Sequence, residues 1–173
     1  AKSSFSPSLI WKLGYSETLD GPLQGECLAT VPGAVQLDYA RAHGWPPYWY
    51  ADEFKRYEWM EDVFWHYDTV LSWTKDMDGR QAFFRCEGID YRWQVRLNNN
   101  LLLEREGMFR PLVLNLSELG ARSGDRLRVT ILPVPKNGDT RGRWEADQTC
   151  KPPCSYGWDW HPRLVPSGIW DAA

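Results

Sequence analysis

The sequence predicts an all-β fold, specifically an antiparallel β-sandwich. Three observations carry this prediction: short runs in which apolar and polar residues alternate, turn residues between those runs, and very little helical periodicity. A half-buried antiparallel strand turns every second side chain toward the core, which produces such an alternation. Gly, Pro, Asn and Ser bound the runs, as expected where short connections join the strands of a sandwich.

The clearest predicted strand covers residues 89–97. Its apolar side chains alternate with polar ones and belong to Ile89, Tyr91, Trp93, Val95 and Leu97. Residues 98–100 are three asparagines, which tolerate left-handed backbone. We therefore expect a hairpin turn there, leading into a strand at 101–103.

The remaining elements follow from the same signals. Residues 62–73 also alternate, with one face made by Val63, Trp65, Tyr67, Thr69 and Leu71. Shorter strands are expected at 80–88, 111–116 and 125–132. A helix is expected at Val35–Ala42, and a turn at Ser117–Gly120. Residues 133–153 lack a period and predict a long loop, which in a compact domain is often functional.

Length and composition exclude several classes of protein. The 173 residues predict one domain, 1–173, long enough to bury roughly 70% of the surface of its unfolded chain. A net charge of −3 argues against a nucleic-acid partner, and no apolar run is long enough to span a membrane. The three histidines are scattered, so we expect no metal site and no cofactor. The N-terminus shows neither an initiator Met nor a signal-peptide layout, which leaves both cytoplasmic and exported locations open.

Cysteine and tryptophan usage add two expectations. Cys27, Cys86, Cys150 and Cys154 are too few and too dispersed for a disulfide scaffold. We expect free thiols, with a Cys150–Cys154 disulfide as the alternative in an exported protein. The 11 tryptophans exceed what a core needs, and a flat indole face suits the C–H face of a sugar ring.

The chain ends in "SYGWDWHPRLVPSGIWDAA", where three tryptophans are interleaved with charged residues. Gly168-Ile169-Trp170 resembles the start of a strand, yet only three residues follow it. A missing last strand would leave a sheet edge uncovered, which natural domains avoid. We therefore expect the chain to be a fragment of a larger protein.

Five blocks of the sequence, in family order, resemble the N-terminal sugar-binding domain of glycoside hydrolase family 2. They are "ATVPGAVQLDYARAHG" (29–44), "YEWMEDVFWHYDTVL" (57–71), "FRCEGIDYRWQVRLNNN" (84–100), "EREGMFRPLVLNLSE" (104–118) and "KPPCSYGWDWHPRLVPSGIW" (151–170). The Trp-Asp-Trp ahead of Gly-Ile-Trp is similar to the β-mannosidase-like branch. This resemblance implies a jelly-roll-like, galactose-binding-domain-like sandwich that is the first domain of a multidomain enzyme.

The resemblance also implies where catalysis takes place. In the family it belongs to a later (β/α)₈ barrel of about 250 residues, which uses two glutamates in a retaining mechanism. We therefore assign no catalytic residue here and expect the chain alone to hydrolyse nothing. The glutamates are expected to be solvated strand-edge and loop carboxylates: Glu58, Glu61, Glu87, Glu104, Glu106, Glu118 and Glu145.

Carried over by position, Asp159 is the acidic residue that contacts sugar hydroxyls in family members. Trp158 and Trp160 would lie on one side of an extended segment, opposite Asp159. They would either pack down to fix Asp159 or stack on the sugar. Arg163 would either pair with Asp159 or cap the loop.

In the resemblance, His161 replaces a glycine common in relatives. Three further features carry two interpretations each. Lys151 is an orienting or a solvated lysine. Glu106, in the loop at 105–111, either approaches the pocket or is an exposed carboxylate. The polar face of the strand at 89–97 is a solvated or interdomain face, or binds a glycan; its residues are Asp90, Arg92, Gln94 and Arg96.

The leading hypothesis is thus a non-catalytic sugar-binding domain of a family 2 exo-glycosidase that acts on β-mannosides. Its expected partners are a carbohydrate with a β-linked terminal sugar and the remaining domains of the same polypeptide. Two alternatives remain: a free-standing carbohydrate-binding module, and a purely structural domain. The position of the richest aromatic block, at a truncated end, favours the enzyme domain over a self-sufficient module.

Overall fold

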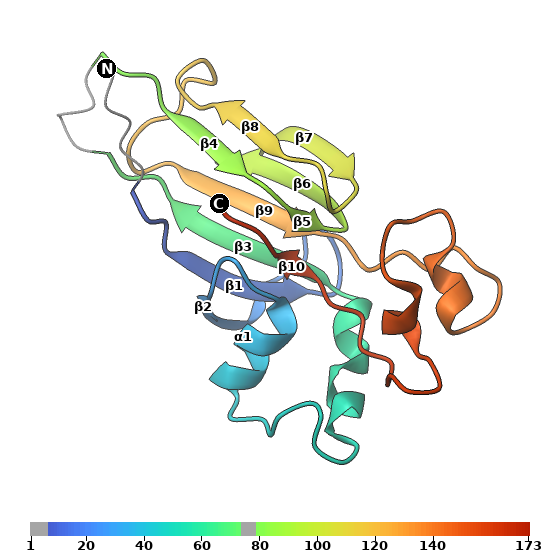
Figure 1. The fold of residues 1–173 in the computed structure, drawn as a ribbon. Helices are drawn as coiled ribbons and strands as arrows, with labels where there is room; N and C mark the ends of the chain where they lie inside the picture. The colour runs from blue at the N-terminus through green and yellow to red at the C-terminus, as the bar shows by residue number, and fades with distance from the viewer. Residues whose placement is uncertain (1–6, 74–78) are drawn as a thin grey trace.

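The computed structural model describes residues 7–73 and 79–173 (Figure 1). The strands are β1 (Trp11–Ser16), β2 (Gln24–Ala29), β3 (Phe64–Val70), β4 (Phe83–Cys86), β5 (Ile89–Asp90), β6 (Arg92–Leu97), β7 (Asn100–Glu106), β8 (Leu112–Asn115), β9 (Arg126–Ile131) and β10 (Gly168–Ile169). The helical elements are α1 (Val35–Ala42) and the 3-10 helices η1 (Glu53–Glu61), η3 (Arg143–Ala146) and η4 (Pro153–Tyr156).

The strands form two layers. One layer is an antiparallel sheet of six strands in the order β2-β1-β3-β9-β6-β7. The other consists of the pairs β4–β8 and β5–β10, which lie over that sheet in Figure 1. The predicted antiparallel β-sandwich is confirmed.

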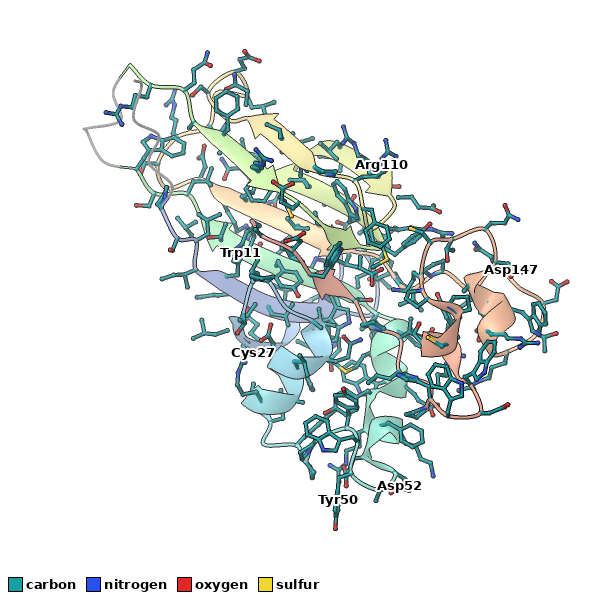
Figure 2. The ribbon with its side chains drawn as sticks, in the orientation of Figure 1. Trp11, Cys27, Tyr50, Asp52, Arg110 and Asp147 are labelled. Carbon is teal, nitrogen blue, oxygen red and sulfur yellow. The ribbon has the colours of Figure 1, made fainter. Side chains whose placement is uncertain are left out.

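The core lies between the layers. Tyr67, Val129 and Val95 are neighbours in the register of β3, β9 and β6, and none of them is exposed to solvent. Trp11, labelled in Figure 2, packs edge-on against Tyr67 and against Phe84 of β4, with ring centroids 6.3 and 6.0 Å away. Every residue predicted on the apolar faces of 62–73 and 89–97 is buried. The reason is that alternate side chains of a strand point to opposite faces, so the apolar residues share the face that packs on the core.

Several local predictions are confirmed, and one is corrected. Helix α1 has the predicted bounds, and Asn98 and Asn99 turn the β6–β7 hairpin with φ angles of 47° and 71°. The predicted strand at 89–97 is instead two strands, because the chain changes layers at Tyr91. Ahead of it β5 pairs with β10, and after it β6 pairs with β7 and β9. Strands β1 and β2 and helix η1 are additional elements that the sequence did not predict. In β1 the alternation is interrupted, because the register shifts beside Gly14.

The polar face of residues 90–96 is not simply solvated. Gln94 is 2% exposed and lies beside Thr130, while Arg96 pairs with Asp20 of the β1–β2 connection. That connection therefore covers part of the outer face of the sheet. Asp90 belongs to the second layer and is also buried. The solvated-face interpretation is wrong for Asp90 and Gln94.

Residues 133–166 form a lobe beside the sandwich, which we call the C-terminal lobe (Figure 1). It contains η3 and η4 and no strand among its residues, as the long-loop prediction for 133–153 implied. It has a small core of its own, made by Val134, Ala146, Tyr156 and Val165. The lobe joins the sandwich through Gln36 of α1, whose amide donates to the Val165 carbonyl at 2.9 Å.

Candidate functional site

The Trp-Asp-Trp sequence forms a tight turn. The Trp158 N–H donates to the His161 carbonyl at 2.9 Å, and the His161 N–H donates back to the Trp158 carbonyl at 3.3 Å. Asp159 and Trp160 therefore occupy the tip of a two-residue hairpin loop. The prediction of an extended segment is wrong, because these bonds close a turn, although the two indoles do line the same hollow.

All three residues of this motif are accessible to solvent. Trp158 is 38% exposed and Trp160 is 72% exposed, and their ring centroids lie 6.4 Å apart. Neither indole belongs to the two core clusters. Asp159 is exposed, and its carboxylate accepts no hydrogen bond from any residue that the structure describes. The turn thus presents a carboxylate without a partner among the described residues, flanked in the sequence by two accessible tryptophans.

The base of the hairpin is held firmly. The Leu164 N–H donates to the Ser155 carbonyl at 2.9 Å, which pairs the two arms below the turn. The Tyr156 hydroxyl is buried and donates to the Pro135 carbonyl at 2.7 Å. The turn is therefore an exposed tip on an ordered base.

Arg163 lies at this base and is only 9% exposed. Its guanidinium donates to the Glu61 carboxylate at 2.7 and 3.1 Å, to Glu145, and to the Tyr156 carbonyl at 3.2 Å. Arg163 therefore does not pair with Asp159. All the hydrogen-bond donors of its guanidinium bind acceptors of Glu61, Glu145 and Tyr156. This arrangement joins η1, η3 and the hairpin, which are distant in the sequence.

The same contacts correct the prediction for two glutamates. Glu61 and Glu145 are 5% and 6% exposed, so they are not solvated carboxylates. Burial opposes the charge of Arg163, but the hydrogen bonds that its guanidinium donates to Glu145 and Glu61 outweigh burial and raise the pKa of Arg163. Burial likewise opposes ionisation of Glu145, yet the bonds from Arg163 and the Gly142 N–H lower its pKa. Arg163 and Glu145 are therefore both charged at neutral pH.

Lys151 is buried as well, with 1% of its surface exposed, which rules out a solvated lysine. Its ammonium donates to both oxygens of Asp90, at 2.6 and 2.7 Å, and to the Pro166 carbonyl at 2.8 Å. Burial raises the pKa of Asp90 and lowers that of Lys151, and their mutual attraction opposes both shifts. The pair fixes the chain on both sides of the hairpin to β5.

Arg143 also contributes to this site, although it was not among the residues expected from the sequence. Its guanidinium carbon lies 4.5 Å from the ring centroid of Trp144 and 4.7 Å from that of Trp158. Cations are attracted to the faces of indole rings, so this contact fixes Trp158 from outside the hairpin. The only sequence signal was an Arg-Trp pair in a loop expected to be functional.

Glu106 does not join this group. It lies at the end of β7, is exposed, and pairs with Arg92 of β6 at 3.1 Å. Among the bonds of the described residues, Glu106 makes no hydrogen bond or ion pair to the Trp158–His161 turn. His161 contributes its backbone to the turn, and its Nδ1 lies 2.6 Å from the Pro162 carbonyl oxygen.

Two hollows lie near the hairpin. An open apolar hollow of about 270 Å³ is lined by Pro153, Cys154, Trp158 and Trp160. A polar hollow of about 380 Å³ lies between η1 and residues 136–145. Most of the charged groups in the polar hollow already pair with one another, through Arg141–Glu58, Lys136–Asp62 and the Arg163 bonds. We therefore assign the candidate site to the turn and the apolar hollow.

The described part of the chain contains no group of three or more His, Cys, Asp or Glu residues placed to hold a metal ion. All four cysteines are free thiols. None of its helices has the length and apolar character needed to cross a membrane.

Known proteins are similar to this chain in sequence and in fold. The family described as "Glycosyl hydrolase 2 galactose-binding domain-like" matches residues 11–171. Beta-mannosidase B of Aspergillus clavatus is 27% identical over 158 residues, which cover 81% of this chain and 18% of that protein. The β-D-mannosidase of Dictyoglomus thermophilum superposes with a TM-score of 0.76 at 25% identity, over 94% of this chain and 21% of that one.

A more distant neighbour shows the fold alone. The β-glucuronidase of Faecalibacterium prausnitzii gives a TM-score of 0.51 at 16% identity, over 77% of this chain and 21% of that one. In each of these comparisons, the chain spans about a fifth of the length of the protein that it matches.

Proposed function

The chain belongs to the galactose-binding-like domains of glycosyl hydrolase family 2, and we propose that it supplies one wall of a terminal-sugar pocket. The hydrolase that carries this domain would act on β-mannosides, since both a curated relative and a similar structure are named β-mannosidases. The domain would bind and orient the sugar. Catalysis would belong to another part of that protein.

One observation carries this proposal: the Asp159 carboxylate stands free at the tip of a hairpin with an ordered base. A carboxylate accepts hydrogen bonds from two neighbouring sugar hydroxyls, and such charge-assisted bonds are about twice as strong as neutral ones. An acceptor buried by the ligand without a donor costs about 1–3 kcal/mol, so the carboxylate would also select among sugars. Asp159 is therefore the proposed sugar-binding residue.

The neighbouring residues have distinct proposed roles. Trp158 and Trp160 would cover apolar sugar faces, because both rings are accessible beside the hollow. Arg163 would act by holding the hairpin, since its guanidinium is occupied by Glu61 and Glu145. Glu106 would be a peripheral contact at most, because it pairs with Arg92 at the end of β7.

The test is substitution of Asp159 in the full-length hydrolase. Asp159→Ala should lower kcat/KM for a β-mannoside at least about tenfold, because lost hydrogen bonds to a charged group cost about 1.5–3 kcal/mol. Asp147→Ala is the matched control, because Asp147 is an exposed carboxylate on the same lobe, labelled in Figure 2. If Asp159→Ala retains activity within twofold, the pocket role is wrong.

The alternative is a free-standing carbohydrate-binding module. An antibody against this domain would distinguish the two by the mass of the natural product in source cells. A band several times heavier than 20.1 kDa supports the hydrolase. A band near that mass, together with micromolar binding of mannose, supports the module.

A further inference from the structure

Arg143 is held in one orientation beside the candidate site. Its guanidinium contacts the rings of Trp144 and Trp158, with centroid distances of 4.5 and 4.7 Å. An arginine packed on aromatic rings has already lost much of its conformational freedom, so less is lost when it binds a ligand. Arg143 itself remains exposed to solvent.

The charge of Arg143 is not compensated by the protein. Nearby arginines are paired: Arg141 with Glu58 at 2.9 Å, and Arg163 with Glu61 and Glu145. Within the part of the chain that the structure describes, no carboxylate forms an ion pair with Arg143. The site therefore holds a positioned cation with free N–H donors.

Trp158 connects this cation to the sugar-binding turn. It precedes Asp159 in the turn, it packs on Arg143, and it lines the apolar hollow together with Trp160. A sugar that is held by Asp159 and that covers the hollow would bring its neighbouring unit to Arg143.

We propose that Arg143 binds a carboxylate on the sugar unit next to the one held by Asp159. This inference rests on the proposed function, because it requires a glycan at the turn. A guanidinium offers a planar pair of donors that matches the two oxygens of a carboxylate. The preferred ligand is therefore an acidic glycan in which a β-mannosyl unit is linked to a uronic acid.

The experiment compares two ligands that differ only in this carboxylate. They are thio-linked mannosyl-β-1,4-glucuronic acid and thio-linked mannosyl-β-1,4-glucose, which resist hydrolysis. Calorimetry on the full-length protein should show about fivefold tighter binding of the acidic ligand at low salt, as expected for an exposed ion pair of good geometry. The preference should shrink at high salt, because ions screen exposed charges.

Variants then assign the preference to one residue. Arg143→Gln should abolish this preference, so that the variant binds the acidic and the neutral ligand with equal affinity. Arg143→Lys should retain part of it, since lysine keeps the charge and loses the planar donor pair. Arg141→Gln is the matched control, because Arg141 is an exposed arginine in the same loop that already pairs with Glu58, and it should change neither affinity.

Two results would overturn the inference: equal binding of both ligands by the unaltered protein, or an equal loss for both ligands in Arg143→Gln. The second result would mean that Arg143 only supports Trp158. Failure of the proposed function is seen separately in the neutral ligand, whose affinity should fall in Asp159→Ala. Unchanged neutral binding in that variant would reject the pocket role.

Discussion

The guanidinium of Arg163 forms two-pronged hydrogen bonds to the carboxylate of Glu61, which lies 102 residues earlier in the chain. Glu145 occupies the other side of the same guanidinium. This buried ion pair connects η1 to the hairpin that carries Asp159. The geometry of the candidate site therefore depends on a contact between two distant segments.

Replacing Arg163 with Leu should destabilise the protein by about 3–5 kcal/mol, because two buried carboxylates lose their shared cation. The free energy of unfolding from urea denaturation measures this loss. Arg122→Leu is a suitable control, since Arg122 is exposed and forms no side-chain bond in the described residues. A loss below about 1 kcal/mol in Arg163→Leu would show that the pair is not a structural support.

The Lys151–Asp90 pair makes a second stability prediction. Lys151→Met should cost about 3–5 kcal/mol by leaving Asp90 as an unpaired buried charge. The double variant Asp90→Asn, Lys151→Met should recover part of this loss, because it removes both charges. Urea denaturation of the unaltered protein, both single variants and the double variant gives the coupling between the two residues. Equal stability of the single and double variants would contradict a buried charge pair.

His66 makes a prediction about pH. The Ser16 hydroxyl donates to the Thr18 carbonyl, so it accepts from Nε2 of His66 at 2.7 Å; the Thr130 hydroxyl lies 2.9 Å from Nδ1. Both contacts suit a neutral imidazole. Burial, assisted by the charge of Arg128, lowers the pKa of His66 to about 4.

Stability should therefore fall as the solution is acidified. Below its ordinary pKa of 6.5, His66 gains a proton in the unfolded chain before it does so in the folded one. Above pH 6.5, neutral His66 makes its full contribution to the free energy of unfolding. As the pH falls to about 4, the free energy of unfolding decreases by about 3 kcal/mol. Urea denaturation across this window should show a smaller slope in His66→Asn than in His43→Gln, where the substituted histidine is exposed. Identical slopes would show that His66 does not titrate abnormally.

Some of the candidate site could be recognised from the sequence, and some could not. The position of Asp159 between two tryptophans was visible in the motif, and all three residues are accessible in the structure. The tight turn was not visible, because the segment has no period of its own. Arg143 was missed because nothing in its local sequence indicates contact with Trp158.

The sequence by itself determined the β-sandwich, the buried faces of residues 62–73 and 89–97, the bounds of α1 and the hairpin at Asn98. These features follow from alternation and turn chemistry, which act over a few neighbouring residues. Only the tertiary structure decided that Arg163, Glu61 and Lys151 are buried in ion pairs and that Arg143 pairs with no carboxylate among the described residues. The physical reason is that a charged side chain takes its partner from whatever the fold brings near it. The partner of Lys151 lies 61 residues away, and the two partners of Arg163 lie 18 and 102 residues away.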